Sequence, residues 1–171
     1  MSTRFFIIIF VLIFAISLGG CLMADSSKPS HFESGQTTIV KLFKVNTNGG
    51  LLEIGNLGTP IDGTVIEIPE GALDREVTFS VGYNNGMLNL RAGKSSGIIV
   101  VLSADSLSSF QKHITIKVRF NPSVNPKTIV GYAIDEQGRL HSIDIGSIEK
   151  ESGVVSFYTF TPLMFTWIYI L

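Results

Sequence analysis

The feature that most constrains the fold is a strict alternation of apolar and polar residues in short runs. Ile114–Phe120 reads ITIKVRF, with an apolar residue at every second position, and Val65–Ile68 and Val77–Val81 alternate in the same way. Successive side chains of a β-strand point to opposite faces of a sheet, so a period of two is typical of strands with one buried face. One buried face is the ordinary condition of antiparallel sheets. The alternation therefore predicts an all-β fold.

Short β-rich runs recur through the chain from residue 37 onward. Ten of them are predicted as strands: Thr38–Val45, Leu51–Ile54, Thr64–Ile68, Val77–Tyr83, Ile98–Ser103, His113–Phe120, Thr128–Ile134, Leu140–Ile145, Val154–Tyr158 and Met164–Ile170. About ten strands at this spacing favour an antiparallel β-sandwich over residues 37–171. The apolar stretch Val154–Leu171, which Pro162 divides, is predicted to be a buried last hairpin.

Turn signals separate these runs. Asn48-Gly49-Gly50, Asn84-Asn85-Gly86 and Glu136-Gln137-Gly138 contain residues that tolerate a positive φ. Among them, Asn85-Gly86 is the strongest hairpin signal in the chain. Helical signals are weak, and residues 70–74 and 104–111 have room for one turn each.

The N-terminus has the three parts of a secretory signal. Arg4 gives a positive start, residues 5–18 read FFIIIFVLIFAISL without a charge, and Gly19 and Gly20 are small. The apolar run has 14 residues, whereas a helix needs about 20 to span a bilayer core. Residues 1–20 are therefore predicted to be a cleaved signal peptide.

Cys21 follows this segment and is the only cysteine, so no disulfide can form within the chain. Leu18-Gly19-Gly20-Cys21 resembles the lipobox of bacterial lipoproteins. The resemblance implies cleavage between Gly20 and Cys21, acylation of Cys21, and an anchor in the membrane. Leu22, where an Asp tends to retain lipoproteins at the inner membrane, favours the outer membrane. Residues 21–36 are predicted to be the lipidated Cys and a flexible tether in which His31 is solvated.

A second resemblance lies in the body of the chain. Gly49-Gly50, followed by Ile66–Leu73 (IEIPEGAL) and a strand at Val77–Val81, resembles the ZU5 domain known from ankyrins and netrin receptors. The residues that carry this motif are Gly49, Gly50, Ile68, Pro69, Gly71, Ala72 and Leu73. The resemblance covers about residues 48–170 and implies a β-sandwich. Pro69 would end a strand by removing a hydrogen-bond donor, and Ala72 and Leu73 would turn back under the sheet.

The chain departs from that family at several positions. His113 stands where Pro is usual, and Leu140 stands where Trp is common. Some animal relatives cleave themselves at a His-Phe-Ser in the closing segment. Thr159-Phe160-Thr161-Pro162 occupies that place here, so self-cleavage is not implied.

No motif with catalytic chemistry fits its required context. Gly93-Lys94-Ser95-Ser96-Gly97 matches G-x-S-x-G, but a nucleophile elbow needs a strand before it and a helix after it. The same residues fail as a phosphate-binding loop because Leu88 stands where the leading glycine belongs. We interpret the segment as a loop between strands and predict no enzyme activity and no catalytic residue.

The remaining polar candidates have structural explanations. His113 and His141 lack partners at metal-ligand spacing and are predicted at the surface. Asp135-Glu136, the nearest approach to an acidic cluster, is predicted to be a solvated turn, and no metal or cofactor is expected. Aromatic residues near the C-terminus are predicted to fill the core: Phe160, Phe165, Trp167 and Tyr169.

Charge limits the classes of partner. Residues 21–171 keep 12 of the 13 Lys and Arg residues and all 14 Asp and Glu residues, for a net charge of −2. Without a basic block, nucleic-acid binding is not expected. The sequence favours a membrane-anchored lipoprotein acting as a non-catalytic protein-interaction or structural module of the cell envelope. The alternative is a carbohydrate- or small-ligand-binding β-sandwich.

Overall fold

A computed structural model describes residues 31–90, 94–121, 123 and 128–170. The described residues form twelve strands and no α-helix. The strands are β1 (His31–Glu33), β2 (Thr37–Val45), β3 (Gly50–Ile54), β4 (Thr64–Ile68), β5 (Val77–Asn84), β6 (Met87–Asn89), β7 (Lys94–Ala104), β8 (Ile114–Arg119), β9 (Thr128–Ile134), β10 (Leu140–Glu149), β11 (Val154–Thr159) and β12 (Leu163–Ile170). All ten predicted strands are present, which confirms the all-β prediction.

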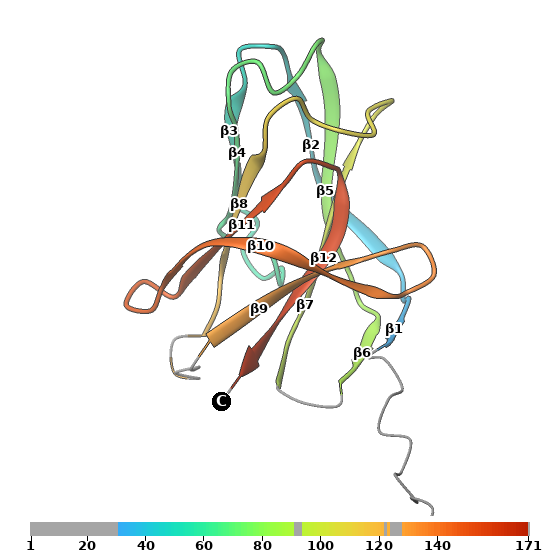
Figure 1. The fold of residues 1–171 in the computed structure, drawn as a ribbon, viewed down its shortest axis with the longest axis vertical. Coiled ribbons are helices and arrows are strands. Elements are labelled where there is room, and N and C mark those ends of the chain that lie inside the picture. The colour runs from blue at the N-terminus through green and yellow to red at the C-terminus, as the bar shows by residue number, and fades with distance from the viewer. Residues whose placement is uncertain (1–30, 91–93, 122, 124–127, 171) are drawn as a thin grey trace, which may run out of the picture.

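Ten strands form one antiparallel sheet that folds back on itself, in the order β2-β5-β7-β12-β9-β10-β11-β8-β4-β3 (Figure 1). The strand β10 joins its two halves, because Leu140–Ile143 pairs with β9 and Asp144–Glu149 pairs with β11. We call β2, β5, β7, β12 and β9 with the start of β10 layer one. The end of β10 with β11, β8, β4 and β3 is layer two. This sandwich has its two edges at β2 and β3.

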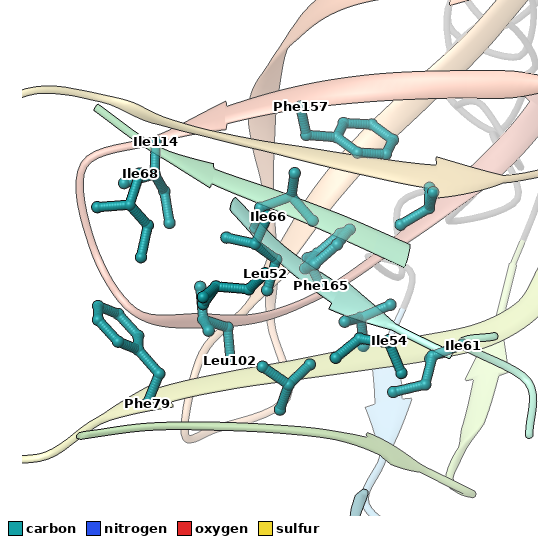
Figure 2. Packing of buried hydrophobic residues seen from close by; sticks show 14 of the residues in the cluster. Leu52, Ile54, Ile61, Ile66, Ile68, Phe79, Leu102, Ile114, Phe157 and Phe165 are labelled. Carbon is teal, nitrogen blue, oxygen red and sulfur yellow. The ribbon is translucent and has the colours of Figure 1, made fainter. Parts of the chain in front are cut away.

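Inward-facing residues of the two layers meet in one apolar core. Strand β8 alternates buried and half-buried residues, and its Ile114, Ile116 and Val118 face inward. Figure 2 shows Ile66 and Phe157 from layer two packed with Phe165 and Leu102 from layer one. Alternation along each strand thus supplies the inner face of both layers, as the sequence pattern predicts.

Over β7, β12 and β9, the outer face of layer one is covered by the small sheet of β1 and β6. Phe32 on β1 is 2% exposed and lies in a second apolar cluster with Ile99 and Ile134. The Phe32 amide donates to the carbonyl of Gly138, 3.0 Å away, so β1 is held between β6 and the β9–β10 turn. The predicted tether is therefore wrong over its last part, because an apolar ring within it finds an apolar face to cover. His31 itself is exposed, as expected.

Two predicted hairpins are also wrong. Asn85-Gly86 does not join paired strands, since β6 pairs with β1 while β5 lies between β2 and β7. The last two strands, separated by Pro162, lie in different layers: β11 pairs with β8 and β10, and β12 pairs with β7 and β9. The burial predicted for this region is correct, but Pro162 marks a crossing between layers rather than a hairpin turn.

Candidate functional site

The two glycines and the IPEGAL segment come together at one end of the sandwich. Gly49 has φ of +73°, and a Cβ there would lie 2.2 Å from the carbonyl oxygen of Ile68. Gly50 pairs with Ile68 in the β3–β4 ladder. Gly49 therefore needs both its positive φ and its missing side chain, because the chain passes directly against the end of β4.

The rest of that motif forms a buried turn. Pro69 follows the last residue of β4, and Gly71 takes a φ of +72° while its amide donates to the Thr47 carbonyl at 2.8 Å. Ala72 and Leu73 are 1% and 3% exposed. These contacts give the motif a structural role in fastening the β2–β3 connection to the turn after β4.

Asn84, at the end of β5, fastens the other end of layer one. Its Oδ1 accepts from the amides of Gly35 at 3.0 Å and Gly86 at 2.8 Å, and its Nδ2 donates to the carbonyl of Gly35 and to Thr37 Oγ1. The side chain is buried with these bonds made. Sequence reasoning assigned Asn84 to a turn and missed this clamp, which requires knowledge of what lies opposite it.

Asp135 organises the β9–β10 turn. Its carboxylate accepts from the amides of Gln137 and Arg139, from Arg139 Nε at 2.7 Å, and from His141 Nε2 at 2.9 Å. These bonds, led by the one from His141, hold the pKa of Asp135 far below its ordinary value. The predicted turn is confirmed, with Gly138 at φ +75°. Because the same turn accepts the Phe32 amide, Asp135 supports the covering of layer one.

Ser95 does not stand in the geometry of a nucleophile elbow. It lies near the start of β7, opposite Ile168 of β12, beside a register irregularity, and its Oγ accepts from the Gly97 amide at 3.1 Å. Gly97 has a φ of +73°. The serine is thus part of a bulged strand, so it is not in a strand–turn–helix corner, and the predicted loop is wrong for Lys94–Gly97. Gly93 lies outside the described residues.

Shallow hollows flank the β1 segment. One has a volume of about 530 Å³ and is bordered by Ser34, Asn84 and Met164. A second, of about 500 Å³, adjoins it beside Phe32 and Gln137. In the described part of the chain, every buried side-chain nitrogen or oxygen has a hydrogen-bond partner, so no unsatisfied polar group is aimed into either hollow.

Strand β2 is an exposed edge. It is a terminal strand of the sheet and, among the strands that the structure describes, pairs only with β5. Ile39 is 47% exposed and Leu42 is 66% exposed. A register irregularity at Val40 and the Lys41 side chain interrupt the run; Lys41 Nζ reaches the Glu53 carbonyl at 3.0 Å and lies over the Phe43 ring. A register irregularity and a charged side chain on an edge strand discourage pairing with arbitrary strands. The β2 edge therefore favours a partner segment that fits around both.

The C-terminal aromatics divide between core and surface. Phe165, Trp167 and Tyr169 are buried, which confirms their predicted place, and Trp167 Nε1 donates to the Tyr169 hydroxyl at 3.2 Å. Phe160 is 56% exposed, so its prediction as a core residue is wrong. It stands in the corner between β11 and β12, where the chain crosses layers and the strand alternation stops.

Phe160 belongs to an exposed aromatic cluster. The His113 ring lies 4.7 Å from the Tyr158 ring and 5.9 Å from the Phe160 ring, centroid to centroid. Tyr158 is 38% exposed, and His113 is exposed as the sequence predicts. Tyr158 follows inward-facing Phe157, so alternation alone places it on the outer face. Its meeting with His113 depends on the β8–β11 pairing, which the sequence does not reveal.

An ion pair lies on the same outer face of layer two. Lys117 Nζ is 2.5 Å from Glu67 Oε1, and both side chains are partly exposed. The pKa of Lys117 is raised, first by this hydrogen bond, with further support from the charges of Glu67 and Glu149. Polar groups therefore stand beside the aromatic cluster.

Two kinds of feature were sought in the ranges that the structure describes, a cluster of metal ligands and a membrane-spanning helix. Among those residues no three His, Cys, Asp or Glu side chains gather as a metal site. No helix there is long and apolar enough to cross a bilayer. Gly20 and Cys21, the predicted cleavage and lipidation positions, lie outside the described residues. The chain matches none of the protein families compared with it, and no curated protein matches it either.

Proposed function

We propose that this chain is a lipid-anchored bacterial envelope protein whose ZU5-like β-sandwich acts as a non-catalytic protein-binding module. The observation that carries the proposal is the β2 edge, with exposed Ile39 and Leu42 beside unpaired backbone groups. An extended segment of a partner can add to such an edge, gaining backbone hydrogen bonds while its side chains meet those of the strand.

The anchor is supported by Leu18-Gly19-Gly20-Cys21 and by the apolar run before it. Residues 22–30 separate Cys21 from β1, and a chain of this length reaches at most about 35 Å. A lipid on Cys21 would therefore keep the sandwich close to the bilayer. Leu22 favours the outer membrane as its location.

The first experiment tests the anchor. The full-length gene is expressed as wild type and as Cys21→Ser, and each product is examined by intact mass and membrane fractionation. We expect a lipid-sized mass increment and an outer-membrane location for the wild type, both lost in the variant. An unmodified, soluble wild type would overturn the anchor.

The second experiment tests the edge. A photo-crosslinking amino acid is placed at Leu42 of the full chain, or at Leu57 as a control, since Leu57 is 91% exposed outside the strands. We expect one envelope-protein adduct from position 42, none from position 57, and loss of the adduct in an Ile39→Asp background. Equal labelling from both positions, or an adduct that survives Ile39→Asp, would contradict the proposed edge.

A further inference from the structure

The outer face of layer two presents a row of side chains that are in register across its strands. The strand registers align five residues across neighbouring strands: Asp144, Tyr158, Thr115, Glu67 and Leu51. Neighbouring strands lie about 4.8 Å apart, so the row is about 19 Å long. Within the described residues, no additional strand lies over this row, in contrast to the β1–β6 cover on layer one.

Three aromatic rings gather around Tyr158, the second residue of this row. Tyr158 belongs to the row, and His113 and Phe160 lie beside it, just before β8 and just after β11. Tilts of 50° and 77° between the His113 ring and its two neighbours make the cluster an uneven cradle rather than a flat stack. Exposure of two adjacent large rings leaves apolar area in water that a bound ligand would cover.

The cradle is held in shape before any ligand arrives. The Phe110 amide donates to the Phe160 carbonyl at 2.7 Å, and Thr159 Oγ1 bonds both the carbonyl and the amide of Thr161. Gly146 lies beneath the tip of the Tyr158 ring, where a Cβ would come within 2.6 Å of Cζ. A prearranged site lowers the ordering cost of binding.

Polar groups border the rings along the row. Glu67 and Lys117 form a partly exposed pair, and Thr115 lies between Tyr158 and Glu67 in the strand register. A purely apolar ligand, such as an acyl chain, would bury this pair without replacing its bonds to water. The favoured ligand has apolar faces and a polar rim.

We propose that this face binds a β-linked chain of pyranose sugars whose ring substituents are equatorial, as in oligomers of glucose or N-acetylglucosamine. The axial C–H groups of such rings form apolar faces that pack on the electron-rich faces of Tyr158 and Phe160. The equatorial hydroxyls point sideways, toward Glu67, Lys117 and Thr115. This site is separate from the β2 edge and goes beyond the proposed protein-binding function.

Binding is tested by calorimetry on the full chain in detergent, with cellohexaose and chitohexaose as probes and the α-linked maltohexaose as control. We expect at least one β-linked oligomer to bind at least tenfold more tightly than maltohexaose, because only an extended chain can cover the Tyr158 ring and continue along the row to Glu67. Absence of binding by both β-linked probes, or equal binding of maltohexaose, would overturn the proposal. Neither outcome bears on crosslinking at β2.

Variants at the aromatic cluster test where the ligand binds. Phe160→Ser and Tyr158→Ser are each expected to weaken binding about threefold to tenfold, whereas Leu57→Ser, at an apolar and still more exposed position, leaves it unchanged. Fluorescence of Trp167, the only tryptophan and 1% exposed, reports that each variant is folded. Undiminished binding by a folded Tyr158→Ser/Phe160→Ser double variant would exclude this cluster as the site.

Discussion

One outer face of the sandwich is partly covered by a second small sheet and the other is open to solvent, although both belong to the same ten-stranded sheet. Over β7, β12 and β9, layer one is covered by Phe32 and the small β1–β6 sheet, which includes residues just after the N-terminal segment. Layer two exposes Tyr158 and, in the adjoining corner, Phe160. The fold does not require aromatic side chains to be exposed on an outer face, because the same chain covers part of the other face with a short strand.

The largest effect is expected from removing the cover. Phe32→Ala should lower the free energy of unfolding by about 3 kcal/mol, since truncation of a buried Phe leaves a cavity among Ile99 and Ile134. The matched change on the open face, Phe160→Ala, should alter it by less than about 0.5 kcal/mol. Urea unfolding followed by Trp167 fluorescence measures both. Similar losses from the two variants would show that the faces do not differ as described.

Substitutions at Gly86, under the covered face, and at Gly146, on the open face, test the same difference between the two faces. A Cβ on Gly86 would lie 2.4 Å from the Phe32 ring and 2.3 Å from the Glu33 carbonyl oxygen, which belongs to the backbone of β1. Gly86→Ala should therefore cost about 2 kcal/mol, because β1 must shift. On the open face, the three atoms nearest a Cβ on Gly146 all belong to side chains, two at the tip of Tyr158 and the Ser156 Oγ at 2.7 Å, so Gly146→Ala should cost less, about 1 kcal/mol.

The same two variants separate stability from binding. Gly146→Ala should weaken oligosaccharide binding because it displaces the Tyr158 ring, whereas Gly86→Ala should leave the affinity of the folded protein unchanged. Calorimetry beside thermal unfolding measures both properties. A reversed order, with Gly86→Ala impairing binding more, would mean that the cradle depends on the covered face.

The pH dependence of the cover is set by Asp135. Its pKa is lowered in the folded protein, so its bonds contribute stability above its unfolded pKa of about 3.9 and lose it as the pH falls toward the folded pKa. Asp135→Asn should therefore be less stable than wild type at pH 7. The gap should narrow as the pH falls from 4 to 2. Paired thermal melts measure it, and a gap independent of pH would contradict an ionic role.

The sequence predicts the ten strands of the large sheet because each strand buries one face. Apolar residues therefore occupy every second position, as in Ile114–Val118. It does not predict β1 and β6. Each has three residues, too few to display a period, and β1 is stabilised by Phe32 meeting residues 50 or more positions away. The pairing of β11 with β8, which brings Tyr158 to His113, is equally non-local.

Of two turn signals in the sequence, one predicts the structure correctly and the other does not. The turn at Glu136–Gly138 is predicted because its backbone needs a positive φ at Gly138. Glycine adopts a positive φ whatever its surroundings, so the signal can be read from the residue type alone. Asn85-Gly86 carries a stronger local hairpin signal, yet the Asn84 side chain binds Gly35 and Gly86, and the chain leaves the sheet there. A tertiary contact thus overrides local turn chemistry, and the Phe160 corner escapes prediction for a similar reason.

The smallest effect is expected from the ion pair on the open face. The raised pKa of Lys117 means that the stability contributed by its bond to Glu67 is present at neutral pH and is lost only as the pH rises above about 10.5. Both side chains are about 40% exposed, so solvent screens them, and Lys117→Met should change the free energy of unfolding by less than about 0.5 kcal/mol at pH 7. Urea unfolding at low and high salt measures this. A loss above about 2 kcal/mol would mean that the pair is shielded from water, and the open face would then be covered after all.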